Sequence, residues 1–560
     1  MTTSHVSPFS RRQFIKMVSA GGLVFSSSCA SDNRYDVLIL GGEIIDGTGE
    51  APFRADVGIQ NGRITSIGDL GGQAGRRIID ADGLVVSPGF IDIHNHSDYN
   101  LLSEPLCESM VRQGVTTMVL GEGNSAGPVR PNEQEWTTLG GYFDVVARQG
   151  VAVNICSYVG QGQVWSYVKG DNHTPATESE ISEMSRLVEE AMQEGAMGLS
   201  TSLLMPPHNL ITTGQLVELA EAAHTHGGIY STHIRDEGRG VFDSVSEAIE
   251  IGRRTGCRVD IIHLKIAHKE LWGRMDEVLA MISDARDEGL DIRANVYPYT
   301  AGQNNLVAII PPWAHEGGRE QLLSRLGDPA QRRRMRRDIL EGIPGWYNHY
   351  LATGDGWDGM ILVSLSSSEN KPFEGRRMGE LLNHRGGDPV ETFFDILLEE
   401  NGDIPAVFFH HSEEDMQLAL AQPYTSVGSD GAAVSIGGSA GPAHPHPRFY
   451  GTFPRVLGRY VRELELLTLP EAVRKMTGMN ADKINLKERG YIRKGYHADV
   501  AVFDPGRIID RATFQEPNQY AEGIVNVIVN GEIILDDDSR TEVLPGKVIR
   551  SAGSDLLNGK

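Results

Sequence analysis

Short apolar segments alternate with amphipathic ones through the middle of the chain, from residue 87 to residue 485. Apolar residues recur with helical spacing in the segments 178–194, 213–226, 241–255 and 274–289, and short apolar runs of strand length lie between these segments. Repeated strand and helix patterns are typical of a parallel sheet covered by helices. The alternation therefore predicts an α/β protein whose main domain is a parallel barrel.

The two ends of the chain carry a different pattern. Residues 36–42 and 56–68 form short β-type runs with an Asn61-Gly62 turn, and residues 499–504 and 524–535 repeat this style with an Asn530-Gly531 turn. We therefore expect one small β domain built from both termini, residues 34–86 and 486–550, followed by a tail over 551–560.

One stretch interrupts the strand and helix rhythm. Residues 303–358 do not continue it, which predicts an inserted lid over the mouth of the barrel that excludes water and shapes the substrate pocket. The segments 360–364 and 406–410 both look like buried strands, so the candidates number nine or more for a barrel of eight. At least one of them must lie outside the barrel.

Polar residues end four of the strand candidates. His94 and His96 follow the first, His233 and His263 each end a later one, and Asp430 ends the last. Barrels of this type present catalytic groups at the carboxyl ends of their strands, and residues i and i+2 of a strand share a face. Four histidines and an aspartate at one end of a barrel predict a metal site.

Composition and charge narrow the class of protein. The chain has 560 residues, 40% of them hydrophobic and 22% charged, with a formal net charge of -24. Binding to a nucleic acid requires a basic patch that displaces the counterions of the phosphates. We therefore expect no nucleic-acid partner for such an acidic chain. Beyond the N-terminal segment, no apolar run reaches the roughly 18 residues of a membrane-spanning helix.

The N-terminus is a separate element. Arg11 and Arg12, with Phe14, Lys16 and an apolar run over 17–25, resemble a twin-arginine export signal, so residues 1–33 are expected to direct export to the periplasm. Whether Cys29 is acylated as a lipoprotein anchor stays open. The other three cysteines are widely spaced, which indicates buried thiols rather than a disulfide framework.

Several longer motifs resemble those of the N-acyl-D-amino-acid deacylase (D-aminoacylase) branch of the amidohydrolase superfamily, over residues 36–545. The motifs that carry this resemblance are 87–98 (SPGFIDIHNHSD), 114–117 (GVTT), 198–202 (GLSTS), 233–237 (HIRDE), 263–265 (HLK), 297–302 (YPYTAG), 428–431 (GSDG), 446–455 (HPRFYGTFPR) and 498–504 (ADVAVFD).

The resemblance implies a TIM-like (β/α)8 barrel, here over residues 87–485, with a small β-sandwich and one or two zinc ions at the barrel mouth. It implies that His94 and His96 hold one metal and that His233 and His263 hold the other. Asp430 would act as general base and then as general acid on water that the metal activates. The reaction implied is hydrolysis of an N-acyl-D-amino acid to a carboxylate and a free D-amino acid.

The chain departs from this family at the ligand expected to bridge the metals. The related deacylases carry a cysteine after the second strand, whereas this chain has Gly121-Glu122-Gly123 there. A carboxylate can bridge two zinc ions through its two oxygens, so we expect Glu122 to be the bridge. The alternative is a loop glutamate separated from the metal by water.

Three residues are expected to bind substrate. Lys265 follows His263 by two positions, so it can pair with the α-carboxylate of an N-acyl amino acid, to which Tyr297 can donate a hydrogen bond; the resemblance supports both roles. Gln303 stands where the family has a small hydroxyl residue, which leaves the preferred substrate open. The alternative for Lys265 is a structural ion pair.

Two other functions stay open at this stage. A cyclic-amide hydrolase of dihydroorotase or hydantoinase type, or another amidase, uses the same metals and aspartate without needing Lys265 to meet a carboxylate. A periplasmic metal-binding scaffold would keep the barrel without turnover. The acyl group, the amino-acid side chain, the D or L configuration and the oligomeric state are not determined by the sequence.

Overall fold

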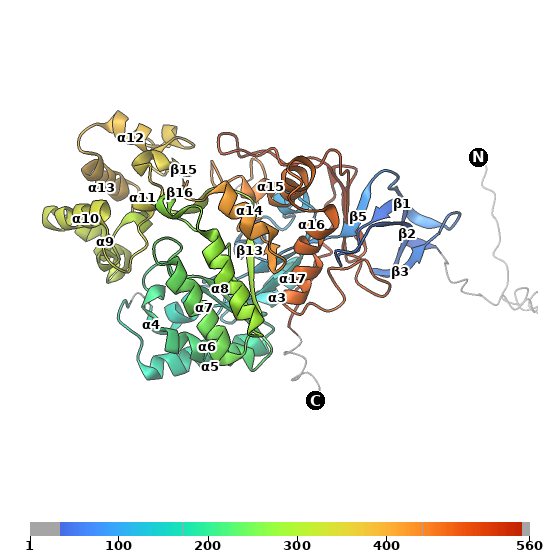
Figure 1. Cartoon of the computed structure of the whole chain (residues 1–560), viewed down its shortest axis with the longest axis horizontal. Coiled ribbons are helices and arrows are strands. Elements are labelled where there is room, and N and C mark those ends of the chain that lie inside the picture. Colours follow the sequence, from blue (N-terminus) through green and yellow to red (C-terminus); the bar gives the residue numbers. More distant parts are fainter. Residues whose placement is uncertain (1–33, 171, 439–440, 552–560) are drawn as a thin grey trace, which may run out of the picture.

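The computed structural model describes residues 34–170, 172–438 and 441–551. Figure 1 shows three parts in a row: a small β domain with strands β1 to β3 at one end, the barrel in the middle, and a helical insertion with α9, α10, α12 and α13 at the other end. The predicted export signal and Cys29 lie outside the described residues.

The barrel is built from parallel strands that run in chain order. These are β6 (Phe90–Asp92), β7 (Val115–Leu120), β8 (Asn154–Ser157) with its direct continuation β9 (Val159–Gly160), β10 (Gly198–Ser202), β11 (Ile229–His233), β12 (Val259–Ile261), β13 (Ile292–Val296) and β17 (Thr425–Val427). A parallel bridge between Asn95 and Gly431 connects the segments that follow β6 and β17. Because β8 and β9 act as one strand, the barrel has the eight strands expected of its fold.

Amphipathic helices cover the barrel where the sequence predicted them. They are α5 (Glu178–Gln193), α6 (Thr213–His224), α7 (Val241–Thr255) and α8 (Met275–Asp287). Thr177 and Thr212 start α5 and α6 with capping boxes, in which the threonine oxygen accepts a hydrogen bond from the third helical N–H. Each helix turns its apolar face to the strands, as in α7, where Val241, Val245 and Ile249 are buried.

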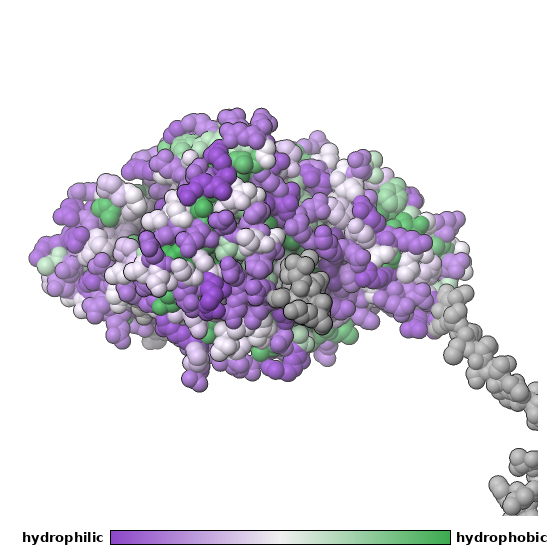
Figure 2. Space-filling view, turned by 90° about the horizontal axis from the view of Figure 1, so that it is seen from below, coloured by the Kyte–Doolittle hydropathy of each residue, from purple (hydrophilic) through white to green (hydrophobic). Residues whose placement is uncertain are grey.

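Further helices complete the barrel domain. They are α1 (Asn100–Ser103), α2 (Glu108–Val111), α3 (Leu139–Gln149), α4 (Gln161–Lys169), α14 (Glu413–Ala421), α15 (Arg448–Arg455), α16 (Leu469–Met476) and α17 (Gly478–Lys483). In the described part of the chain, every helix is too short or too polar to cross a membrane. Figure 2 shows one face of the molecule as mainly hydrophilic, with apolar residues scattered over it.

Both termini join in one nine-stranded sheet, which confirms the predicted β domain. The N-terminal strands are β1 (Tyr35–Ile44), β2 (Phe53–Gln60), β3 (Arg63–Gly68), β4 (Gly75–Asp80) and β5 (Val85–Pro88), and the C-terminal ones are β18 (Val500–Phe503), β19 (Ile524–Val529), β20 (Glu532–Asp536) and β21 (Ser539–Arg540). The antiparallel pairing of β5 with β18 connects the two halves. Asn61 and Asn530 adopt the left-handed backbone conformation at the two predicted turns.

The insertion is longer than the predicted 303–358. Its strands β14 (Gly302–Asn305), β15 (Met360–Leu362) and β16 (Pro405–Phe408) form a separate antiparallel sheet, so both surplus strand candidates lie outside the barrel. Its helices are α9 (Gly318–Leu326), α10 (Pro329–Glu341), α11 (His349–Ala352), α12 (Met378–Arg385) and α13 (Pro389–Glu399). A separate hydrophobic core extends from Leu306 to Phe408. Because β15 and β16 are buried in that core, their apolar pattern could not be distinguished from that of barrel strands.

Candidate metal centre

The loops after β6 and β17 are held together beneath the site by Asp92. Its buried carboxylate accepts hydrogen bonds from the backbone N–H of Ser429 at 2.7 Å and from the side chain of Asn95 at 2.8 Å. In addition, the N–H of Asp430 donates to the carbonyl of His94 at 2.8 Å. These bonds fix the two segments that carry His94, His96 and Asp430 against each other.

Two of the predicted site residues have an unusual backbone conformation. His263 has φ 40° and Asp430 has φ 51°, in the left-handed region that residues other than glycine rarely adopt. Such positions cost roughly 1–3 kcal/mol each and persist where the surrounding structure imposes them. Asn295 helps to hold the backbone of His263 in this conformation, because its side-chain oxygen accepts a 2.9 Å hydrogen bond from the backbone N–H of His263.

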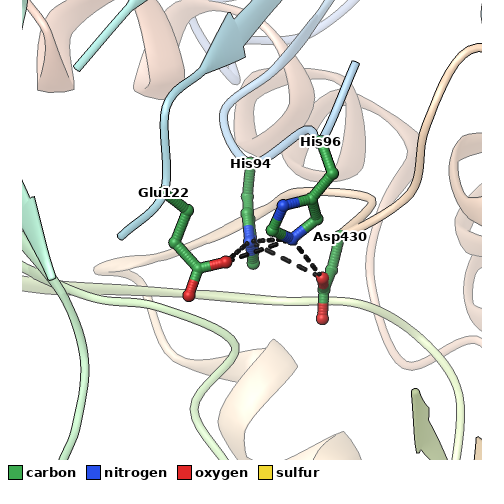
Figure 3. Close-up of side chains that lie close together, drawn as sticks. All are labelled: His94, His96, Glu122 and Asp430. Atoms are coloured by element: carbon green, nitrogen blue, oxygen red, sulfur yellow. Dashed lines mark hydrogen bonds and ion pairs between the residues drawn. The ribbon is translucent and has the colours of Figure 1, made fainter. Parts of the chain in front are cut away.

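Four of the predicted residues form the first donor set, and Figure 3 shows their side chains pointing toward one another. Nε2 of His94 lies 3.2 Å from Nε2 of His96. Oε2 of Glu122 lies 2.8 Å from Nε2 of His94 and 3.0 Å from Nε2 of His96. Oδ1 of Asp430 lies 2.9 Å from Nε2 of His96. Two imidazoles and two carboxylates therefore converge at one place.

The second donor set uses the other oxygen of Glu122. Oε1 of Glu122 lies 3.2 Å from Nδ1 of His233, and that nitrogen lies 3.2 Å from Nε2 of His263. These three residues also form a group whose donor atoms lie within 4.8 Å of one another. Glu122 is thus the one residue common to both sets among the described residues.

The charges of this cluster favour a bound cation. Burial disfavours the imidazolium form of His96, but the carboxylates of Asp430 and Glu122 outweigh burial and raise the pKa of His96 to about 10. Burial also opposes ionisation of Glu122, yet His94 and the other imidazoles keep its pKa well below the usual range. Histidine nitrogens and carboxylate oxygens are ligands of zinc, so the donor set fits that metal.

Lys265 lies beside the second donor set rather than free in the cavity. It is buried, its ammonium contacts the carboxylate of Glu237, and Nζ lies 2.7 Å from Nδ1 of His263. The structural ion pair, which was the alternative for Lys265, is therefore present. Tyr297 is also buried and lines the same cavity as Lys265.

Gln303 lies on β14 of the insertion and lines this cavity too. Its side-chain oxygen accepts a hydrogen bond from the backbone N–H of His446 at 3.2 Å. The cavity has a volume of ≈ 30 Å³ and is also lined by His349 and His410 from the insertion.

Arg448 is a site residue that the sequence did not single out. It begins α15, its side chain is 4% exposed, and Nη1 lies 2.7 Å from Oδ2 of Asp430. The guanidinium also lies over the ring of Tyr297, 4.8 Å from its centroid. Within the described residues, the buried Nε of Arg448 has no hydrogen-bond partner, whereas Nη1 is occupied by the ion pair with Asp430. In the sequence, Arg448 could be connected with the site only through the motif 446–455, because no predicted strand ends at this residue.

Comparison with known proteins gives a consistent result. The model of the amidohydrolase family matches residues 77–339 and 365–535. A D-aminoacylase from Alcaligenes xylosoxydans xylosoxydans is 35% identical over 541 residues, which cover 93% of this chain and 98% of the relative.

Two solved structures are similar over nearly the whole chain. The N-acyl-D-glutamate deacylase from Bordetella bronchiseptica, complexed with zinc and a phosphonate that mimics the tetrahedral intermediate, is 31% identical, with a TM-score of 0.78 and coverage of 92% of this chain and 100% of the other. A D-aminoacylase with a binuclear metal centre is 34% identical, with a TM-score of 0.76 and the same coverage. The chain therefore belongs to the amidohydrolase family, as a metal-dependent hydrolase of the branch that contains the D-aminoacylases.

Proposed function

We propose that this protein hydrolyses the amide bond of N-acyl-D-amino acids with the help of one or two zinc ions. The observation that carries the proposal is the position of Asp430. One of its oxygens lies in the histidine cluster and the other lies 2.7 Å from the buried cation Arg448. A proton acceptor and a site for a carboxylate are thus adjacent, as a substrate with a carboxylate next to its amide bond requires.

The metal would be held by both donor sets. His94 and His96 would hold one ion and His233 and His263 the other, with Glu122 between them through its two oxygens. When bound, zinc lowers the pKa of a coordinated water to about 7 and polarises a carbonyl. The zinc complex of the deacylase from Bordetella bronchiseptica supports this choice of metal.

Asp430 would move the proton. Burial opposes its ionisation, but Arg448 and the imidazoles keep the pKa of Asp430 well below the usual range, so it enters the reaction as a carboxylate. It would take a proton from the attacking water and deliver it to the departing amine, because an amine leaves readily only after protonation. The backbone hydrogen bond from its N–H to the carbonyl of His94 holds the residue in place between the two events.

The α-carboxylate of the substrate would bind to Arg448, with Tyr297 and Lys265 nearby. The buried Nε of Arg448, which has no hydrogen-bond partner among the described residues, would donate to this carboxylate while Nη1 stays paired with Asp430. Lys265 would contribute as a second positive charge, held in place by Glu237. Gln303 would contact the substrate from the insertion side of the cavity.

A substrate panel tests this function. Purified protein loaded with zinc is assayed with N-acetyl D- and L-amino acids, hydantoin and dihydroorotate, and product formation is followed by chromatography. We expect turnover of the D-enantiomers of the acyl amino acids. Turnover of the cyclic amides alone would instead support the hydantoinase or dihydroorotase function, in which no carboxylate needs Arg448.

We also propose that the chain is exported to the periplasm, on the basis of Arg11, Arg12 and the apolar run that follows. The test is cell fractionation of the full-length protein and of the variant with Arg11→Lys and Arg12→Lys. We expect the variant to stay in the cytoplasm. Mass spectrometry of the mature N-terminus then establishes whether Cys29 is present and acylated. Periplasmic accumulation of the variant would contradict the proposal.

A further inference from the structure

Glu237 lies directly behind the second donor set. It belongs to the segment after β11, four residues beyond His233, and is 4% exposed. The motif 233–237 ends with this residue, but its position in the motif alone assigns it no role. Its two oxygens face three different side chains, and these contacts define what it can do.

The carboxylate of Glu237 faces the outer nitrogens of both histidines. Oε1 lies 3.0 Å from Nδ1 of His263 and also contacts the ammonium of Lys265. Oε2 lies 3.6 Å from Nε2 of His233, which is an electrostatic contact rather than a hydrogen bond. The opposite nitrogens, Nε2 of His263 and Nδ1 of His233, lie 3.2 Å apart on the side of Glu122.

We propose that Glu237 is a positioning residue that holds His233 and His263 in the orientations required to bind the second metal. Its carboxylate lies against Nδ1 of His263 and Nε2 of His233, so the opposite nitrogens of the two rings stay directed toward Glu122. Carboxylates behind metal-binding histidines commonly act in this way, and their loss weakens metal binding by roughly 10–100-fold. The inference rests on the metal centre of the proposed function.

Lys265 has a defined part in this arrangement. A carboxylate buried at this position needs a positive partner, because an unpaired buried charge is strongly unfavourable. Lys265 supplies that charge, since its ammonium contacts Oε1 of Glu237. Nζ of Lys265 also lies 2.7 Å from Nδ1 of His263, so the ammonium and the carboxylate together flank this edge of the ring.

His94 of the first donor set has no such neighbour among the described residues: its carboxylate contacts are made by Nε2, and Nδ1, which points away from the cluster, has no hydrogen-bond partner. Nε2 of His233 has no hydrogen-bond partner either, but it faces Oε2 of Glu237 at 3.6 Å. Removing Glu237 should therefore affect the two metal positions unequally. This inequality separates a positioning role from a merely structural one, since a general loosening of the fold would weaken both positions.

The test is a zinc titration of metal-free protein against a chromophoric chelator, with the affinities of the two positions fitted separately. The variants are Glu237→Gln and the double variant Glu237→Gln with Lys265→Met, which avoids leaving a lone buried cation. Glu247→Gln is the matched control. Glu247 pairs with Arg235 at 2.9 Å, close to His233 in the chain, and contacts neither donor set.

We expect both variants that carry Glu237→Gln to bind the second zinc roughly 10–100-fold more weakly, with the first zinc unchanged. Glu247→Gln should keep the second affinity within about threefold, since it retains both Glu237 and Lys265. Thermal unfolding of each metal-free variant shows whether it is folded.

Three results would overturn the inference, each in a different way. If the folded double variant binds both zinc ions as the wild type does, Glu237 does not position the histidines, and the proposed function stands. If the wild type binds no zinc, the metal centre itself is wrong and the role of Glu237 falls with it. Equal weakening of both positions in the double variant would also contradict a role confined to the second metal.

Discussion

Nη1 of Arg448 lies 2.7 Å from Oδ2 of Asp430, and the other oxygen of that carboxylate faces His96 at 2.9 Å. A single aspartate is thus shared between a buried guanidinium and a cluster of metal-binding groups. Because the buried Nε of Arg448 has no hydrogen-bond partner in the described part of the chain, it is available to a substrate carboxylate while Nη1 stays paired with Asp430. This relationship connects the position of the substrate to the position of the proton acceptor.

Replacing Arg448 should remove the preference for a free α-carboxylate. For Arg448→Met we expect kcat/KM for an N-acetyl-D-amino acid to fall by about 10- to 150-fold, which corresponds to the loss of roughly 1.5–3 kcal/mol from hydrogen bonds to a charged group. The corresponding N-acetyl-D-amino-acid amide lacks that charge, so its kcat/KM should change little. Steady-state kinetics on the two substrates check this. An equal loss on both would show that Arg448 acts through Asp430 instead.

Replacing Asp430 should abolish proton transfer. We expect Asp430→Asn to lower kcat by about two to four orders of magnitude, because an amide cannot accept the proton of the attacking water. The measurement is kcat at saturating substrate, with the zinc content determined on the same samples. Since His94, His96 and Glu122 remain, the protein should keep zinc at the first position. Wild-type turnover by Asp430→Asn would exclude its role as general base.

The sequence predicted the donor residues because each lies at the end of an apolar strand. His94, His233 and Asp430 could be identified from this pattern alone, since strand ends meet at the mouth of a barrel. The spacing did not indicate that Glu122 directs one oxygen to each histidine pair, because this depends on the path of the loop after β7. The structure shows this geometry, and the bridging role itself stays a proposal.

Three other features could not be predicted, each for a physical reason. Arg448 begins a helix within a proline-rich segment, so no periodic pattern connects it with Asp430, 18 residues earlier in the chain. The partner of Lys265 depends on the turn after β11, which brings Glu237 back toward His263. Strand β16 has the apolar pattern of a barrel strand, and only its pairing with β14 and β15 assigns it to the insertion.

A buried ion pair connects the barrel interior to the site. Nζ of Lys483 lies 2.6 Å from Oδ1 of Asp260, and Oδ2 accepts a 2.8 Å hydrogen bond from Asn295, which in turn holds the backbone of His263. We expect Lys483→Met to lower the free energy of unfolding by about 3–5 kcal/mol, because Asp260 is left as an unpaired buried charge. Denaturant unfolding measures this. The double variant with Asp260→Asn should recover part of the lost stability. If it is no more stable than Lys483→Met, the loss does not come from the unpaired charge of Asp260.

The cysteines of the described chain should be unreactive while the protein is folded. Burial raises the pKa of Cys107 and of Cys156 to about 12, and both thiols are fully buried. At pH 8 only about one thiol in 10,000 would be ionised, and the thiolate is the reactive form. We expect alkylation by iodoacetamide, followed by mass spectrometry, to modify Cys107 and Cys156 only after unfolding. Rapid labelling of the native protein at either residue would contradict the burial of these thiols.

Glu122 offers the sharpest test of the metal centre, because its two oxygens face different histidine pairs. Glu122→Gln keeps the size of the side chain but removes its charge and replaces one oxygen by a nitrogen that cannot coordinate zinc. We therefore expect it to retain fewer than two zinc ions per chain after dialysis against a weak chelator, measured by elemental analysis.

Glu122→Cys introduces the residue that the related deacylases carry, and a thiolate can also bridge two zinc ions, so this variant should retain more zinc than Glu122→Gln. Glu133→Gln serves as the control, since its side chain accepts a bond from the backbone of Arg130 at 3.2 Å and belongs to neither donor set. If the wild type, Glu133→Gln and Glu122→Gln all retain the same two zinc ions, Glu122 does not bridge, and the two histidine pairs bind their metals independently.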